Sequence, residues 1–222
     1  MKSLYPVFLL LLCTNYLSAK KIYLSDPVLL TRLDTLDEYA RKAPKESEET
    51  IQKLAEYLTV PAKTNLEKAR LLFTWVATHV KYDVSAFNSG KLGEQSAAGV
   101  MKKKKAVCEG YSNLIKELCT AAGLESEKVV GYSKGYGYKP GKKFKESNHT
   151  WNVIKIDGTW KLFDATWASG YGIEVDGKMK GITRFDPYWF DVNPKTFIFS
   201  HMPEDDNRQL LEEPITLKEF ED

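Results

Sequence analysis

The sequence is poor in the residues that build disulfide frameworks and metal sites. Only three cysteines and three histidines occur among 222 residues, and so few cysteines exclude a disulfide-stabilised scaffold. An HExxH motif and paired CxxC motifs are both missing, and so is the GxxxxGK[ST] pattern of a phosphate-binding loop. We therefore expect the protein to work without a bound metal or another cofactor.

The sequence also lacks a dominant charge. Its 32 basic residues are nearly balanced by 30 acidic ones, which gives a net charge of +2. This balance argues against a nucleic-acid-binding protein that depends on phosphate contacts. Hydrophobic residues make up 43% and charged residues 28% of the chain, a composition typical of a globular protein.

The first 19 residues have the pattern of a secretory signal peptide. A charged start precedes the apolar run at residues 7–12, which is too short to span a bilayer, and small residues end the segment. We expect cleavage after residue 19 and a secreted or periplasmic protein. The alternative is a lipoprotein anchored through Cys13, although Leu12 is bulky where a small residue is usual. Beyond this segment we expect no transmembrane segment.

Residues 20–222 are expected to form a single domain, with a core at about 47–192 and a tail at 193–222. Apolar residues with helical spacing predict helices over 30–40, 47–58, 64–80 and 108–122. Alternating patterns then predict strands over 128–138, 149–156, 159–164 and 188–192, with a second hairpin turning at 174–177. Helices followed by antiparallel strands indicate an α+β fold. Residues 83–106 are expected to form a loop, and the tail a short helix and irregular structure.

Cys108 opens the predicted helix over 108–122. The free N–H groups and the positive dipole end of a helix stabilise a thiolate, which is the nucleophilic form of cysteine. Cys119 lies eleven residues further along the same helix, about 16 Å away. A disulfide requires Cα atoms within about 7 Å, so we expect both thiols to be free and Cys119 to be buried and inert.

A hairpin brings a histidine and an aspartate together. The Asp157-Gly158 pair predicts a tight turn between strands 149–156 and 159–164. In this register residues 151 and 164 face each other, so His149 and Asp164 are diagonal neighbours. The spacing suits a carboxylate that orients an imidazole, and the imidazole can exchange a proton with Cys108.

Three segments together resemble the transglutaminase-like superfamily. They are Ala106-Val-Cys-Glu-Gly-Tyr-Ser-Asn-Leu114, His149-Thr-Trp-Asn-Val153 and Leu162-Phe-Asp-Ala-Thr-Trp167. The resemblance implies a papain-like core with N-terminal helices packed on an antiparallel sheet. It also implies that Cys108 is the nucleophile, His149 the general base and acid, and Asp164 the orienting carboxylate. The tail segments 186–190 and 201–205 are similar to a branch that includes the kyphoscoliosis-peptidase-like proteins.

Other site residues are less strongly determined by the sequence. The Cys108 backbone N–H is one expected oxyanion donor. Papain-like enzymes take the second donor from a glutamine six residues before the cysteine, but this position is Lys102 here. The other upstream candidates are Gln95, Tyr82 and Trp75, and of these Gln95 is favoured. Tyr82 and Trp151 are expected to line the substrate cleft, whereas His201 is expected to be structural.

These observations predict a secreted thiol acyl-transfer enzyme of the transglutaminase-like cysteine peptidase or amidase type. It would hydrolyse peptide or isopeptide bonds through a thioester. The expected substrate is a peptide or protein, and cell-wall peptide is one candidate. Two alternatives stay open, namely a protein-crosslinking transglutaminase and a non-catalytic binding or scaffold module of the cell envelope.

Overall fold

The computed structural model describes residues 27–222, so the predicted signal peptide and Cys13 lie outside the described residues. Helix α2 (Pro27–Arg41) comes first and contains the predicted helix over 30–40. Residues 36–222 form one compact unit, and the arrangement below concerns that unit. Among the described residues, no helix is both long and apolar enough to cross a membrane.

The first half of this unit is helical. Its elements are η1 (Lys45–Glu49), α3 (Ile51–Thr59), α4 (Asn65–His79), β1 (Lys81–Tyr82), α5 (Val84–Ser89), α6 (Ala97–Lys103), β2 (Lys105–Ala106) and α7 (Cys108–Ala121). Threonine side chains cap two helices, because Thr50 accepts the Lys53 N–H and Thr64 accepts the Glu67 N–H. Helix α4 therefore begins at the predicted position, whereas α3 begins at Ile51, after the separate 3-10 turn η1, rather than at residue 47.

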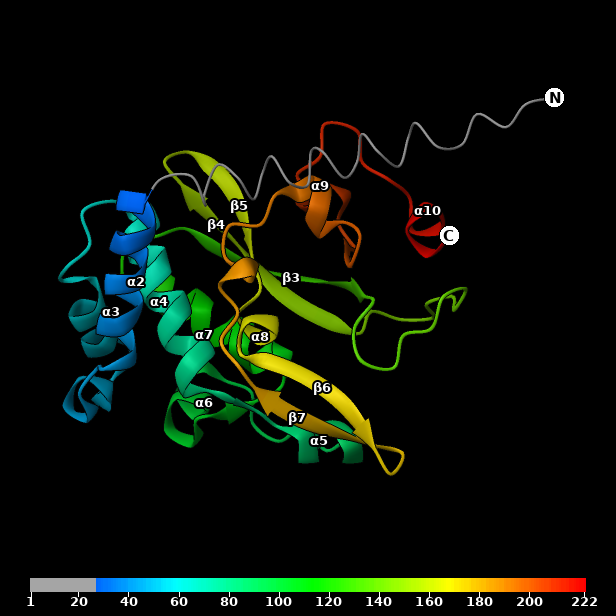
Figure 1. Ribbon diagram of the computed structural model, residues 1–222, viewed down its shortest axis with the longest axis horizontal. Helices are drawn as coiled ribbons and strands as arrows, with labels where there is room; N and C mark the ends of the chain where they lie inside the picture. The colour runs from blue at the N-terminus through cyan, green and yellow to red at the C-terminus, as the bar shows by residue number, and fades with distance from the viewer. Residues whose placement is uncertain (1–26) are drawn as a thin grey trace. The chain divides into compact units, whose positions relative to one another are not determined.

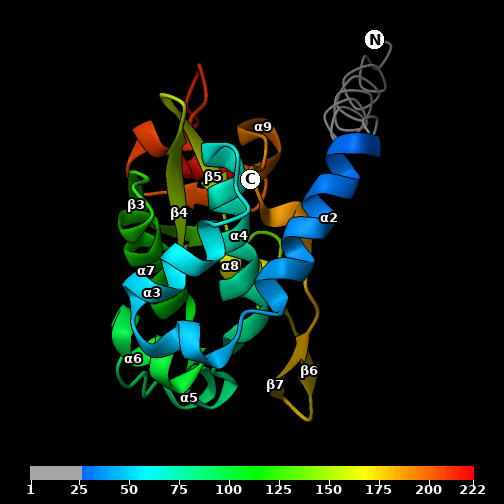
Figure 2. The same ribbon diagram turned by 90° about the vertical axis from the view of Figure 1, so that its left-hand side faces the viewer.

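The second half is built around a four-stranded antiparallel sheet. Its strands are β3 (Ser126–Ser133), β4 (His149–Ile156), β5 (Thr159–Phe163) and β8 (His201–Pro203), in the order β5-β4-β3-β8. Helix α7 packs against β3 and β4, and α3 and α4 pack on α7 (Figure 1). Figure 2 views the molecule from the side on which these helices cover the sheet. The α+β fold with helices on an antiparallel sheet is confirmed.

The β4–β5 hairpin has the predicted register. Asp157 and Gly158 both have positive φ, at 49° and 86°, as a two-residue type I′ turn requires. Asn152 pairs with Phe163, so the continuing register places Asp164 diagonally across from His149. The second predicted hairpin is also present, as β6 (Gly170–Val175) and β7 (Lys178–Thr183).

Three sequence predictions are corrected. Residues 83–106 are not a loop, because α5, α6 and β2 lie within them; their helical spans of six and seven residues are too short to give a clear periodic signal. Residues 188–192 form no strand, because Pro187 starts the 3-10 turn η2 (Pro187–Trp189). The tail holds the edge strand β8, besides α9 (Pro194–Phe197), η3 (Asp206–Gln209) and α10 (Leu217–Glu221).

Two glycines permit close packing beside the helix and strand that carry Cys108 and His149. A Cβ atom at Gly110 would lie 2.6 Å from the Ala106 Cβ, and one at Gly131 would lie 2.2 Å from the Met202 oxygen. Gly131 pairs with His149 on β4 and with Pro203 on β8. A side chain at this position would separate the strands that carry the two histidines.

A buried ion pair connects two of the helices. Arg70 on α4 donates two hydrogen bonds of 2.7 Å to the Asp37 carboxylate, and the Thr74 hydroxyl donates a third. All three side chains are buried. Removing one partner of a buried pair leaves the other charge without compensation.

We expect Arg70→Ala to lower the free energy of unfolding by about 3–5 kcal/mol, because Asp37 keeps its burial and loses both charged bonds. Urea denaturation followed by circular dichroism measures the change. Lys155→Ala is the control, because it removes a surface ion pair with Glu125 and should cost much less. Equal losses for the two variants would contradict this assignment.

Candidate active site

Cys108 is the first helical residue of α7, directly after the N-cap residue Val107. Its side chain is partly exposed and its thiol is free. The segment before the helix is held by Gln95, whose side-chain Oε1 atom accepts the Val107 N–H at 3.1 Å. The Asn113 side chain donates to the Gln95 backbone oxygen. These bonds fix the position of the thiol at the end of the helix where backbone N–H groups are free.

His149 begins β4 and lies beside Asp164, which follows β5. The His149 Nε2 atom is 2.7 Å from Asp164 Oδ2, and both side chains are buried. Helix α7 is held against β4 by the Asn152 side chain, which donates to the Ser112 backbone oxygen at 3.1 Å. The structure thus brings together the cysteine, histidine and aspartate that the sequence singled out.

Both oxygens of the Asp164 carboxylate have two partners. Asp164 is the N-cap of α8 (Ala165–Ala168), and its Oδ1 atom accepts the backbone N–H groups of Thr166 and Trp167. Its Oδ2 atom accepts from His149 and, at 3.0 Å, from His201 Nε2. A carboxylate with this many donors is held in one orientation.

His201 lies at the site, although the sequence predicts only a structural role for it. This residue starts β8, is fully buried, and stacks on Phe197 with ring centroids 4.0 Å apart. Its Nδ1 atom is 2.8 Å from the Ser200 hydroxyl. The available signal was its position in the tail segment 201–205, which shares in the family resemblance, whereas a three-residue edge strand leaves no periodic pattern.

The electrostatics favour a thiolate beside an imidazolium. Burial tends to raise the pKa of Cys108, but its hydrogen bond to His149, the charge of His149 and bonds with Thr150 outweigh burial and lower this pKa. Burial tends to lower the pKa of His149, yet the charge and hydrogen bond of Asp164, with a contribution from Cys108, raise it to about 10. The pKa of Asp164 lies far below its ordinary value, because His149 and His201 outweigh its burial.

His201 and Cys119 remain uncharged near neutral pH. Burial lowers the pKa of His201 to about 4, against the opposing effect of Asp164. Burial raises the pKa of Cys119 to about 12. Of the two imidazoles on Asp164, therefore, His149 is the one whose pKa favours the protonated form, and of the two thiols only that of Cys108 has a lowered pKa.

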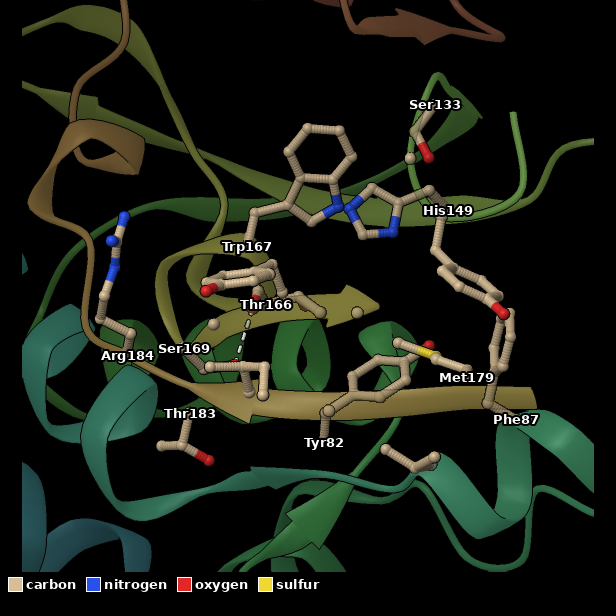
Figure 3. A pocket seen from close by; sticks show the side chains of 18 of the residues that line it. Tyr82, Phe87, Ser133, His149, Thr166, Trp167, Ser169, Met179, Thr183 and Arg184 are labelled. Atoms are coloured by element: carbon tan, nitrogen blue, oxygen red, sulfur yellow. Dashed lines mark hydrogen bonds between the residues drawn. The ribbon is translucent and has the colours of Figure 1, made fainter. Parts of the chain in front are cut away.

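A cavity of about 560 Å³ opens beside His149 (Figure 3). Its walls come from α5, the β3–β4 loop, the β6–β7 hairpin and the segment around α8. In Figure 3 the Trp167 and His149 rings lie side by side, with Tyr82 and Phe87 across the cavity. Its volume falls within the range of small-molecule and side-chain binding sites.

The less determined site residues have different positions. Tyr82 lines the cavity as expected. Trp151 is 1% exposed and packs in the core with Phe197, behind His149, rather than in the cavity wall. The Gln95 side-chain amide donates to the Leu92 oxygen, so in this structure Gln95 holds the approach to α7, and its role as an oxyanion donor stays a prediction.

The two histidines and the aspartate lie close enough together to be candidate metal ligands. Within the described residues, His149, Asp164 and His201 bring three candidate ligand atoms within 4.8 Å of one another. Both Nε2 atoms already bond to Asp164 Oδ2. The geometry is that of a hydrogen-bonded His-Asp-His group.

Comparisons with known proteins identify the family of the chain. Residues 52–165 match the family model described as the transglutaminase-like superfamily. The chain is 33% identical over 193 residues to the human protein named kyphoscoliosis peptidase, covering 86% of this chain and 29% of that protein. It is 30% identical over 207 residues to Hillarin of Drosophila melanogaster, covering 89% and 25% respectively.

A solved structure described as a TGase is 19% identical with a TM-score of 0.40, and the match covers 77% of this chain and 41% of that one. The family match covers half of the chain and contains both Cys108 and His149 together with Asp164. The chain belongs to the transglutaminase-like superfamily. It spans less than a third of the length of the two curated relatives.

We expect iodoacetamide to alkylate Cys108 rapidly near pH 7, and Cys119 only slowly, because only the first has a lowered pKa. Mass spectrometry of tryptic peptides measures both rates across pH. His149→Ala should shift the Cys108 profile to higher pH, because the thiolate loses its cationic partner. Cys119→Ser is the control and should leave that profile unchanged. Equal rates at the two cysteines would contradict the assignment.

Proposed function

We propose that the protein is a thiol acyl-transfer enzyme that hydrolyses amide bonds in peptides or proteins. The observation that carries the proposal is the contiguous set of Cys108, His149 and Asp164 beside an open cavity. An ionised thiol at a helix start and a protonated imidazole held by a carboxylate are the groups that covalent acyl transfer requires.

The first half of the proposed reaction forms a thioester. The Cys108 thiolate attacks the carbonyl carbon, and the oxyanion that develops is bound by the backbone N–H at the start of α7. We propose Gln95 as the second donor: one N–H of its side-chain amide is bonded to the Leu92 oxygen, and the other is the group that would donate to the oxyanion. The C–N bond then breaks as His149 donates its proton to the departing amine.

The second half returns the enzyme to its starting state. Neutral His149 takes a proton from a water molecule, and the resulting hydroxide attacks the thioester carbonyl. The C–S bond breaks, a carboxylic acid product leaves, and Cys108 is again a thiolate beside an imidazolium. Asp164 holds the imidazole in the orientation that both proton transfers need.

We favour hydrolysis over transfer to a lysine amine. A crosslinking enzyme must keep water from its thioester until an amine arrives, whereas the cavity beside His149 is lined by partly exposed side chains. The name of the human relative also denotes a peptidase. The crosslinking alternative would be supported if amine transfer exceeded hydrolysis.

The non-catalytic alternative has a different expectation. A binding module would not need a lowered thiol pKa or a carboxylate saturated with donors, and both are present here. The proposed location, secreted or periplasmic, rests on the signal-like residues 1–19 alone. A peptide or protein is the proposed substrate, and cell-wall peptide belongs to this class.

We expect Cys108→Ala to abolish peptide hydrolysis, because the other described thiol, Cys119, is buried and its pKa is raised to about 12. Turnover is measured by mass spectrometry on a peptide library, with a labelled primary amine present to detect transfer. Cys119→Ala is the matched control and should retain turnover if the fold is intact. Equal hydrolysis by wild type and Cys108→Ala would contradict the proposal. Amine-labelled products without hydrolysis would show that the protein is a crosslinking enzyme instead.

A further inference from the structure

The cavity beside His149 has aromatic walls on several elements. Aromatic side chains line it from β1, α5, the β3–β4 loop, α8, β6 and η2, and they are Tyr82, Phe87, Tyr136, Trp167, Tyr171 and Trp189. Three of these rings are substantially exposed, with 42% for Phe87, 37% for Tyr136 and 52% for Tyr171. Exposed aromatic surface gathered around one cavity favours an apolar or aromatic occupant.

The rings form two groups on opposite walls of the cavity. Phe87 meets Tyr136 edge to face with centroids 5.9 Å apart, and Tyr82 lies 6.1 Å from Phe87. Trp167 meets Trp189 in the same manner at 4.8 Å. A ring inserted between these walls would find partners at the separations that aromatic pairs prefer.

The cavity also carries excess positive charge. Lys81, Lys134 and Arg184 line it, against a single carboxylate, that of Asp186. The Asp186 Oδ1 atom already accepts the Tyr188 N–H, and Lys134 lies over the Phe220 ring. The Arg184 guanidinium sits 5.7 Å above the Tyr171 ring. Because Lys134 lies closer to its ring than Arg184 does to Tyr171, and no ring contact is found for Lys81 within residues 27–222, we take Lys81 and Arg184 as the cations that would meet an incoming carboxylate.

Other lysines close to the site are neutralised within the fold. Lys103 pairs with Glu94, Lys104 with Glu48, and Lys105 with Asp83. The run of lysines before Cys108 is therefore mostly compensated, whereas the structure gives Lys81 and Arg184 no ion pair among the described residues. The local excess of charge belongs to the cavity and not to the lysine run.

We propose that this cavity selects peptides in which an aromatic side chain stands next to an acidic one. The aromatic side chain would enter between Phe87 and Trp167, and the carboxylate would meet Lys81 or Arg184 at the rim. A volume of about 560 Å³ admits two adjacent side chains. The proposal deepens the proposed function, because it takes the occupant to be the substrate.

The test measures binding separately from turnover. Cys108→Ala protein is titrated by fluorescence anisotropy with labelled peptides that contain Asp-Phe, Asn-Phe or Asp-Ala at the same position. We expect at least tenfold tighter binding of the Asp-Phe peptide than of either of the others, and a loss of its advantage over Asn-Phe as salt rises.

Variants assign each preference to a wall. In the Cys108→Ala background, Lys81→Gln with Arg184→Gln should remove the preference for Asp over Asn, and Phe87→Ala should remove the preference for Phe over Ala. Lys102→Gln, an exposed lysine outside the cavity, is the control and should change neither. Equal binding of the three peptides, or preferences that survive these variants, overturns the proposal.

The two proposals fail separately. If wild-type protein hydrolyses peptides without regard to these side chains, the proposed function stands and the selectivity falls. If Cys108→Ala protein binds Asp-Phe peptides selectively but wild type hydrolyses none of them, the selectivity stands and the hydrolytic function falls.

A second inference rests on an independent observation, the two imidazoles on one oxygen of Asp164. His201 does not touch the cavity, yet its Nε2 atom is 3.0 Å from the oxygen that His149 also contacts. Ser200 fixes the other ring nitrogen and Phe197 stacks on the ring. With Ser200 donating to Nδ1, the neutral ring carries its proton on Nε2 and donates it to Asp164.

We infer that His201 is a positioning residue that orients the Asp164 carboxylate. The negative charge of this carboxylate is then shared between the hydrogen bonds from His201 and His149. Without this donor more of the carboxylate charge acts on His149, and the carboxylate is free to rotate. His201→Ala should therefore lower kcat with little change in KM. In the Cys108 alkylation profile, the change that accompanies loss of the His149 proton should move to higher pH.

His201→Gln is the matched variant, because its amide can donate to the same oxygen and should restore the alkylation profile in part. Thermal unfolding of both variants separates stability from positioning. Because alkylation needs no substrate, this readout survives failure of the proposed function. A His201→Ala protein that loses stability but keeps the wild-type alkylation profile would show a purely structural role.

Discussion

The structure depends on one carboxylate that is completely satisfied by hydrogen bonds. Asp164 ends β5, caps α8 and receives two imidazoles, so one side chain joins the central hairpin, a short helix and the edge strand β8. A buried carboxylate without these donors would be costly to ionise. Because it has them, it stays charged and raises the pKa of His149, and His149 in turn lowers the pKa of the Cys108 thiol.

The neighbouring structure serves this arrangement. Gly131 lets β3 pass between the strands of the two histidines, and Gly110 lets the start of α7 approach α6. Gln95 holds the residue before Cys108. The two glycines therefore act on the position of the reacting groups and not on their chemistry.

Much of the site could be predicted from the sequence, because it depends on local signals. The Asp157-Gly158 turn fixes the hairpin register, and that register alone places His149 near Asp164. Cys108 begins its helix as predicted. The parts that escaped prediction depend on contacts between distant segments: β8 is too short to show alternation, and His201 reaches Asp164 across 37 residues. Trp151 and Trp167 look equivalent in sequence, yet Trp151 lies on β4 and points into the core, whereas Trp167 lies on the short helix α8 and lines the cavity.

The short parallel pairing of β1 with β2 has a mechanical consequence. Lys81 pairs with Lys105 and Tyr82 with Ala106, and the Asp83 N–H bonds to the Ala106 oxygen at 2.8 Å. The wall that carries Tyr82 is therefore tied to the chain two residues before Cys108. The cavity wall and the approach to the nucleophile therefore share one short stretch of paired backbone.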